Sequence, residues 1–590
     1  MMIEKYVANA VESALQSLQI KISDPAKDIV IQPTRIEFDG DFSLVCFGLS
    51  RFSGKNPEET ARLIGDYLIK QNELFDRYSI IKGFLNLSLK ASIWLSLFEN
   101  FKPEVASSAR LSKKVMIEYS SPNTNKPLHL GHIRNNLLGY SLGLIHQAAG
   151  NDVHLVNLIN DRGIHICKSM LAWMKEGDGE TPESSGIKGD HLVGKYYVLF
   201  DKHYKQQIEM LMQQGMSKED AEKQAPWMLE AQELLRKWEK GDETTINLWR
   251  TMNGWVYAGF DQTYHRLGVK FDKIYYESET YLLGKDIIEE GLIKGVFFKK
   301  EDGSVWIDLT ADGLDQKLVL RADGTSVYIT QDIGTAVKRN EELHCNDYVY
   351  VVGSEQEYHF KVLKLILKHL GYDWSDGIYH LSYGMVDLPS GKMKSREGTV
   401  VDADDLMDEV IHEAKSKALE IGKTEVDADE DLYRKIGLAA LKYYILKVDP
   451  KKKMLFNPAE SIDINGHTGP FIQYAYARIC SLKRKALEQK VASIEFDSAY
   501  LNDKRHLNIV KKIMQYQSIV IQAAQAFSPA LLANYLYELA KEFNQFYHDF
   551  PVLKEQESGL AAFRLLIAEK TGETLLKGMG LLGIEMPESM

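Results

Sequence analysis

Two histidines stand three residues apart in the stretch EYSSPNTNKPLHLGHIRNN, which begins at Glu118. They follow VMIEYS, whose composition is that of a buried strand, and they precede an apolar run with helical spacing. His129 and His132 are therefore predicted on one face of the first turn of a helix. A helix N-terminus offers free N–H groups and a positive dipole end, and Gly131 leaves room for a flat ring beside the backbone. The pattern indicates a phosphate-binding corner, although ordinary capping histidines remain the alternative.

A second stretch with chemical potential is SGKMKSREGTVV, which carries Lys392, Lys394, Ser395 and Arg396 between glycines. Cations on such a loop can stabilise the charge that develops on a leaving pyrophosphate. A solvated charged turn is the alternative. The chain contains no G-x-x-x-x-G-K-[ST] motif, so a Walker-type phosphate loop is excluded.

Two acidic residues stand at positions that need an explanation. Tyr328 and Asp332 lie four residues apart in TSVYITQDIGTAVKR and are predicted to share a helix face. Glu118 lies within an apolar strand, where an unpaired carboxylate would be costly. The alternatives are a surface ion pair for Asp332 and the solvated face of the strand for Glu118.

Composition limits the class of protein. A chain of 590 residues, with 45% hydrophobic and 26% charged residues, is an ordinary globular protein of several domains. No apolar run is long enough to span a membrane. Four scattered cysteines without a C-x-x-C pair fit a reducing cytoplasm and argue against disulfide or zinc frameworks. The net charge of −12 does not exclude nucleic acid, because binding needs only a local basic surface.

Hydrophobic periodicity divides the chain into three parts. Residues 1–110 are predicted as a small α/β unit, with helices over YVANAVESALQSL and NPEETARLIGDYLIK and a strand over SLVCFGLSRF. Residues 111–428 are predicted as a parallel α/β core, interrupted by a mostly polar helical insertion at about 177–276. This core resumes with the strand DYVYVVGSEQ and the helix EYHFKVLKLILKHLGY. Residues 429–590 are predicted as an all-α bundle without a clear strand.

HLGH and the downstream KMKSR resemble the paired signature motifs of class I aminoacyl-tRNA synthetases. The longer strings SSPNTNKPLHLGHIRNN, GHTGPFIQYAYARICSLKRKA and LLKGMGLLGIEMPESM resemble arginyl-tRNA synthetases, over nearly the whole chain. The resemblance implies a Rossmann-like catalytic domain with a connective insertion. It also implies an N-terminal domain that contacts the tRNA and a helical domain that reads the anticodon. The implied reaction joins arginine to tRNA(Arg), with ATP and Mg²⁺ as a substrate complex and no tightly bound cofactor or dedicated metal site. A cytoplasmic monomer is expected.

The resemblance also assigns residues. Asp332, Tyr328 and Glu118 match the guanidinium pocket, and Asn123 and Gln356 match residues that hold the α-amino group. The implied ATP contacts are His129, Gly131, His132, Lys392, Lys394, Ser395 and Arg396. The chain departs from the family pattern at Ser395, which stands where a second signature lysine is usual. Lys126, Lys394 and Arg396 are the candidates for the missing cation.

Basic and aromatic residues interleave in DPKKKMLF and FIQYAYARICSLKRK. Phosphate contacts are expected from these basic residues and base stacking from the tyrosine: Lys451, Lys452, Lys453, Lys483, Arg484, Lys485 and Tyr474. For any one of these residues, a solvated helix face is an equal alternative. Two other functions fit parts of the sequence: a small-molecule nucleotidyltransferase, which has no need of a long helical C-terminal part, and an inactive tRNA-binding paralogue.

Overall fold

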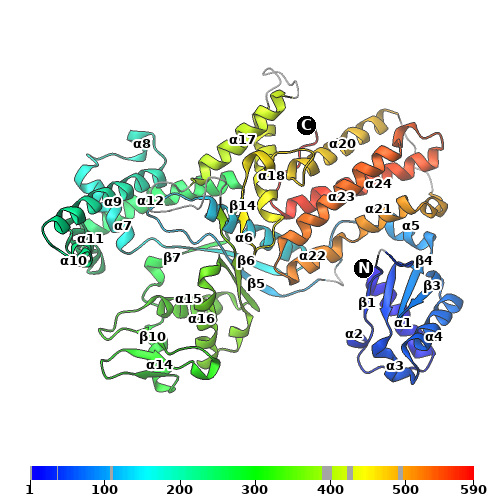
Figure 1. Cartoon of the computed structure of the whole chain (residues 1–590), viewed down its shortest axis with the longest axis horizontal. Helices are drawn as coiled ribbons and strands as arrows, with labels where there is room; N and C mark the ends of the chain where they lie inside the picture. The colour runs from blue at the N-terminus through cyan, green and yellow to red at the C-terminus, as the bar shows by residue number, and fades with distance from the viewer. Residues whose placement is uncertain (1–2, 36, 107–109, 388–400, 421–428, 490–495) are drawn as a thin grey trace.

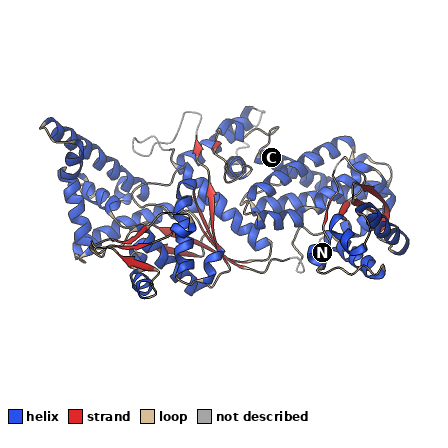
Figure 2. Ribbon diagram, turned by 60° about the horizontal axis from the view of Figure 1, so that its bottom comes forward, coloured by secondary structure: helices blue, strands red, loops and turns tan. Residues whose placement is uncertain are grey.

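The computed structural model describes residues 3–35, 37–106, 110–387, 401–420, 429–489 and 496–590. The molecule is elongated (Figure 1): a central parallel sheet separates a helical insertion at one end from the C-terminal helices and the N-terminal unit at the other. Figure 2 shows strands in the centre and in the N-terminal unit, with helices over most of the remaining chain. Among the described residues, no helix has the length and apolar character needed to cross a membrane.

The N-terminal unit has a four-stranded antiparallel sheet in the order β1-β2-β4-β3. Its strands are β1 (Ile31–Pro33), β2 (Phe42–Val45), β3 (Phe75–Ile81) and β4 (Phe84–Leu89). Its helices are α1 (Ile3–Ser17), α2 (Pro25–Asp28), α3 (Phe47–Ser53), α4 (Pro57–Gln71) and α5 (Ala91–Glu99). The side chain of Asn56 caps α4 by accepting a hydrogen bond from the N–H of Glu59 at 2.8 Å.

The strand predicted over SLVCFGLSRF is wrong in its second half. The strand ends at Val45, and α3 follows directly. Gly54 closes α3 in the left-handed conformation, with φ of 68°. A glycine at this position commonly ends a helix, and the prediction of a strand did not take it into account.

The central sheet is parallel throughout, in the order β12-β11-β5-β6-β7. Its strands are β5 (Lys114–Glu118), β6 (Asp152–Ile159), β7 (Lys273–Tyr276), β11 (Asp347–Gly353) and β12 (Ile378–Tyr383). The Rossmann-like parallel-sheet prediction is confirmed. The chain reverses its direction of strand addition between β5 and β11, and ligands of such sheets bind in the crevice at that point, beyond the carboxyl ends of the strands.

Three helices pack on the central strands, beside the crevice at their carboxyl ends. They are α6 (Leu130–Ala148), α15 (Tyr328–Leu343) and α16 (Glu357–His369). Gly139 of α6 lets the helix approach β5 closely, since an added Cβ would lie 2.3 Å from the Tyr119 side chain. The short helix η3 (Ser354–Gln356) joins β11 to α16.

The insertion between β6 and β7 is helical, as predicted, but the predicted bounds of about 177–276 are wrong: it begins with α7 (Ile164–Glu176) and ends before β7, which belongs to the central sheet. The insertion also comprises α8 (Pro182–Ser185), α9 (Gly189–Gln213), α10 (Lys218–Gln224), α11 (Pro226–Glu239) and α12 (Glu243–Leu267). A second excursion, between β7 and α15, was not identified from the sequence. It contains α13 (Glu277–Thr280), α14 (Lys285–Ile293) and a three-stranded antiparallel sheet of β8 (Phe297–Lys299), β9 (Val305–Ile307) and β10 (Lys317–Leu320).

The C-terminal part is mostly helical. Its elements are α17 (Ala403–Glu420), α18 (Glu430–Leu446), α19 (Pro458–Ser461), α20 (Gly469–Glu488), α21 (Lys504–Met514), α22 (Tyr516–Gln525), α23 (Pro529–Asp549) and α24 (Ser558–Leu581). The expectation of no strand here is wrong at β14 (Met454–Leu455), which pairs with β13 (Val386–Asp387). A strand of two residues is too short to show the alternation of apolar and polar residues by which strands are predicted.

The N-terminal unit contacts the C-terminal helices both directly, where Asp41 pairs with Lys511 of α21, and through its linker. Lys570 Nζ donates to the carbonyl of Phe101 at 2.8 Å, and Gln517 Nε2 donates to that of Lys102 at 3.1 Å. The N-terminal unit and the helices α20, α21, α23 and α24 therefore lie at the same end of the molecule (Figure 1).

Candidate active site

The two histidines cap their own helix. His129 is the N-cap of α6, and its Nδ1 accepts a hydrogen bond from the N–H of Gly131 at 3.1 Å. His132 Nδ1 accepts from the N–H of His129 at 3.1 Å, and the ring centroids lie 4.0 Å apart. Because both Nδ1 atoms accept, each neutral ring carries its proton on Nε2 and can donate it. The predicted position of the two histidines at the start of the helix is confirmed, and the capping role given as the alternative is present. Phosphate binding stays a prediction.

Both rings are neutral near pH 7. Burial, together with the nearby Lys126 ammonium, lowers the pKa of His129 to about 4. Burial also holds the pKa of His132 well below its usual value, and His129 and Lys126 add to the effect. The pKa of Lys126 is itself lowered by burial. Its charge acts on both imidazoles, so this candidate cation lies near them. The arrangement offers two neutral hydrogen-bond donors and one positive charge.

The other predicted ATP contacts, Lys392, Lys394, Ser395 and Arg396, lie outside the described residues. The segment that follows them is described, and it pairs with the histidine corner. The N–H of Leu130 donates to the carbonyl of Val401 at 3.1 Å, and the N–H of Ala403 donates to that of Leu128 at 2.9 Å. The chain after residue 400 therefore runs along the histidine corner.

Asp332 lies in the second turn of α15, and its carboxylate is 38% exposed. Its Oδ2 lies 2.6 Å from Nε2 of His359 on α16, a partner that the sequence interpretation missed. Tyr328, the first residue of the helix, is 80% exposed and stands beside it. The pair forms an accessible wall with an aromatic ring and a carboxylate, as a guanidinium requires.

Two further acids join Asp332, and both were missed from sequence. Glu277 follows β7 directly, and burial, with the nearby Asp161 and Asp332 carboxylates, raises its pKa to about 7. Asp161 follows β6 and accepts hydrogen bonds from Ser278 N at 2.8 Å and Tyr257 Oη at 2.8 Å. The available signal was their position immediately after strands of one parallel sheet.

Glu118, the last residue of β5, is 6% exposed. The solvated-face alternative is therefore excluded. Its Oε2 pairs with the guanidinium of Arg339, and its Oε1 accepts a hydrogen bond from Ser121 Oγ at 3.0 Å. The carboxylate is satisfied within the protein, and its contact with a substrate stays a prediction.

Asn123 and Gln356 are both exposed, after β5 and β11 respectively. The two strands are neighbours, and Glu118 is in register with Tyr350. Asn123 forms a bridge with Asn160, which follows β6. The fold thus brings the two predicted amino-group ligands to one edge of the sheet.

The predicted RNA-binding residues fall into two groups. Lys451, Lys452 and Lys453 are exposed in the loop before β14, and Arg134 Nη2 binds the carbonyl of Lys452 at 2.8 Å. Lys483, Arg484 and Lys485 lie near the end of α20. Arg484, Lys485 and Tyr474 line a cavity of about 600 Å³ with Arg478, Tyr547 and Met590. Arg478 lies 4.9 Å from the ring centroid of Tyr474, so the cavity combines cations with aromatic faces.

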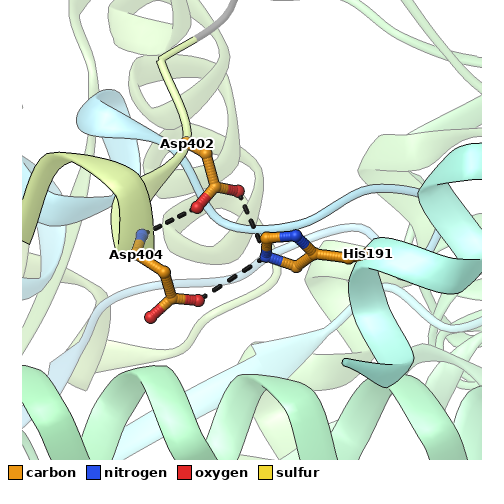
Figure 3. A group of neighbouring side chains, drawn as sticks. All are labelled: His191, Asp402 and Asp404. Atoms are coloured by element: carbon orange, nitrogen blue, oxygen red, sulfur yellow. Dashed lines mark hydrogen bonds and ion pairs between the residues drawn. The ribbon is translucent and has the colours of Figure 1, made fainter. Parts of the chain in front are cut away.

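His191, Asp402 and Asp404 form a separate group (Figure 3), whose ligand-type atoms lie within 4.8 Å of one another. His191 Nε2 is 3.3 Å from Asp402 Oδ2 and 3.6 Å from Asp404 Oδ2. Lys188 Nζ and Arg266 Nη1 bind the oxygens of Asp404 at 2.7 and 3.0 Å. Since two internal cations already occupy this carboxylate, the group is an ion-pair network between the insertion and α17.

Comparisons with known proteins agree with this geometry. Three family models match the chain: the catalytic domain of class I tRNA synthetases (R) over residues 97–457, the DALR anticodon-binding domain over 472–590, and the arginyl-tRNA synthetase N-terminal domain over 2–89. A Bacteroides thetaiotaomicron protein named arginine–tRNA ligase is 54% identical over 96% of each chain. A protein of the same name from Flavobacterium psychrophilum is 52% identical and covers 95% of this chain and 96% of its own.

Solved structures agree at the level of the fold. The arginyl-tRNA synthetase of Thermus thermophilus has a TM-score of 0.82 at 24% identity, with 100% of both chains covered. That of Plasmodium falciparum has a TM-score of 0.77 at 20% identity and covers 100% of this chain and 99% of its own. With the family models and the full-length relatives, these likenesses lead to one conclusion: the chain belongs to the class I arginyl-tRNA synthetase family.

Proposed function

We propose that this protein ligates L-arginine to tRNA(Arg) in two steps. A carboxylate oxygen of arginine attacks the α-phosphorus of ATP and forms a P–O bond while the bond to pyrophosphate breaks, which gives arginyl-adenylate. A hydroxyl of the terminal adenosine of the tRNA then attacks the arginyl carbonyl carbon, and AMP leaves. The carboxylate is already a nucleophile, so the first step depends on positioning and charge stabilisation.

The observation that carries this proposal is the meeting of two unlike sites at one edge of the sheet. The histidine corner follows β5, and the acids Asp332, Glu277 and Glu118 come from α15 and from the ends of β7 and β5. The histidine corner suits a phosphate, and the group of acids suits a cation. An enzyme that joins an arginine carboxylate to ATP needs both within reach of one substrate.

On the ATP side, the Nε2–H groups of His129 and His132 are placed to donate to phosphate oxygens, beside Gly131. Lys126 supplies the positive charge that these neutral rings lack. ATP enters as its Mg²⁺ complex, held mainly through its own phosphates. The loop cations Lys392, Lys394 and Arg396, with Ser395 between them, complete this assignment.

On the arginine side, Asp332 offers a planar carboxylate to the forked guanidinium, and Tyr328 lies against it. Asn123 and Gln356 hold the α-amino group. Glu118 is the second acid of this assignment, with its charge balanced by Arg339. A pocket lined with acids rejects amino acids that cannot match both the charge and the fork, so no editing site is required.

On the tRNA side, the cavity on α20 is suited to an unstacked base, because Tyr474 and Tyr547 offer aromatic faces and Arg478, Arg484 and Lys485 offer charge. Lys451, Lys452, Lys453 and Lys483 would meet phosphates. The domain limits 1–110, 111–428 and 429–590 correspond to tRNA-contacting, catalytic and anticodon-binding parts. We further propose a cytoplasmic monomer, with the four free cysteines kept reduced.

The decisive experiment measures whether the protein attaches each amino acid, tested in turn, to total tRNA. Arginine alone should be attached. A companion assay follows pyrophosphate exchange into ATP with arginine and tRNA present, singly and together. Exchange that needs neither would favour a small-molecule nucleotidyltransferase, and tRNA binding without any charging would favour an inactive paralogue.

A further inference from the structure

The turn after β5 is held in an unfavourable backbone conformation. Ser120 and Ser121 have φ of 77° and 45°, a region that non-glycine residues seldom adopt. Ser120 N donates to Asn135 Oδ1 at 2.6 Å, and Ser121 N donates to Asn157 Oδ1 at 3.0 Å. This turn carries Asn123, so its shape fixes where the amino-group ligand stands.

The side chain of Ser121 gives the turn a third anchor. Its Oγ donates to Glu118 Oε1 at 3.0 Å, so the carboxylate holds the turn from the end of β5. Glu118 can do this only while its own orientation is fixed, and Arg339 binds its other oxygen. The two side chains are 8% and 2% exposed, so water does not compete with either contact.

Arg339 lies on α15, two helical turns after Asp332. Its Nε and Nη2 atoms have no partner of hydrogen-bond geometry among the described residues, and the rings of Tyr275 and Tyr350 flank it, with centroids at 4.8 and 5.9 Å. Among the described residues, Glu118 is thus the acid that accepts a hydrogen bond from the Arg339 guanidinium. A buried ion pair seldom adds much to stability, because apolar residues of the same volume often serve as well. A positioning role explains its presence better.

We propose that Arg339 is a positioning residue for arginine recognition, which locks Glu118 and so ties the helix of Asp332 and Tyr328 to the turn of Asn123. This inference rests on the proposed function. The helix supplies the guanidinium wall and the turn supplies the amino-group ligand. Arg339 therefore sets the spacing between the two ends of the bound amino acid.

The test is a double-mutant cycle in arginine-dependent tRNA charging. Arg339→Met should raise the KM for arginine about 30-fold while the KM for ATP changes less than about 2-fold. In a Glu118→Gln background, the same substitution should add less than about 3-fold, because its effect passes through Glu118. Arg339→Lys, which keeps the charge without the fork, should restore part of the affinity.

Two variants separate positioning from folding. Arg564 is another buried arginine, which lies on α24 and pairs with Glu555 at 2.7 Å. Arg564→Met should lower the melting temperature and leave the KM for arginine unchanged. Ser121→Ala leaves the ion pair intact and should still raise the KM for arginine. The proposal is overturned if that KM is unchanged in folded Arg339→Met or in Ser121→Ala, or if the cycle is additive. Failure of the wild type to charge arginine would instead refute the proposed function.

Discussion

Asp332 is the carboxylate that is open to a ligand, since it is 38% exposed and has His359 on one oxygen. Asp332→Asn keeps the shape and removes the charge, so we expect the KM for arginine to rise by about 30-fold or more, with little change for ATP. Steady-state charging kinetics measure both constants. Asp312→Asn is a matched control, because Asp312 pairs with His369 at 2.8 Å outside the site. An unchanged KM for arginine in Asp332→Asn would remove this residue from the pocket.

Glu277 should make arginine binding depend on pH. Its pKa, raised to about 7 mainly by burial, means that the carboxyl is largely neutral below that pH and ionises above it. Arginine stays cationic throughout, so binding should strengthen from pH 6 to pH 8, by at most about tenfold for a single group. The KM for arginine across this range is the measurement. Glu277→Gln should flatten the profile, and a profile that keeps its slope would contradict the assignment.

The same shift affects stability in the opposite direction. Between the ordinary and the raised pKa, the folded protein binds more protons at Glu277 than the unfolded chain does. The free energy of unfolding therefore falls as pH rises through this window. A residue that improves binding while it lowers stability is typical of functional sites.

The sequence predicted the positions of some site residues better than those of others. The histidine corner was predictable because strand, turn and helix follow one another locally, and α6 begins at Leu130 as expected. The burial of Glu118 was predictable from its apolar neighbours, but its partner Arg339 lies 221 positions away, and no local pattern joins the two. His359 and Glu277 carry no motif of their own. They become visible only when the order of the strands is known.

At the scale of elements, the insertion is fastened to α17 by charge. Asp402 and Asp404 stand at the start of α17. They pair with Lys188, the residue before α9, with His191 of α9 and with Arg266 of α12. The Asp404 carboxylate raises the pKa of His191 despite burial. Asp402 and Asp190 also raise it, and the Lys188 ammonium opposes them. The pKa of Asp404 is held far below its usual range, because its cationic partners outweigh its burial.

This network predicts how stability depends on pH. Since the pKa of folded His191 is raised, its contribution is complete below the unfolded value of about 6.5 and is lost as pH rises through the folded value. The melting temperature of the wild type should exceed that of His191→Gln by on the order of 2 °C at low pH, and the gap should close toward pH 8. Calorimetry of both proteins from pH 5.5 to pH 8.5 tests this. A gap that widens with pH would show that the imidazolium is not what joins the elements.

Elements with strong local signals were predicted well. The cap at Asn56, the buried strand β11 and the periodic helices of the insertion all match their patterns. The sheet of β8, β9 and β10 was missed because its strands have only three or four residues, and β14 because it has two. Strands this short form through pairing with distant residues, which periodicity cannot reveal.

At the scale of the whole molecule, an acidic chain must bind a polyanion. With a net charge of −12, long-range electrostatics oppose approach to RNA, so attraction has to come from local groups. The lysines of the loop 451–453 and the cavity on α20 are two such groups, and both lie on the C-terminal side of the catalytic sheet.

The number of phosphates that each group neutralises follows from the salt dependence of binding. The logarithm of the tRNA affinity should fall linearly with the logarithm of salt concentration, because each neutralised phosphate releases counterions. Changing Lys451, Lys452 and Lys453 together to alanine should weaken binding at low salt and reduce the slope by about 0.7–0.9 for every phosphate that is no longer neutralised. Arg484→Ala with Lys485→Ala should reduce it independently, since the two groups share no side-chain contact in the described chain. Filter binding over a range of salt gives the slopes, and the KM for arginine in each variant shows that the catalytic site is intact. A slope near zero in the wild type would mean that neither group meets the phosphate backbone, and the path of the tRNA would have to be sought on another face.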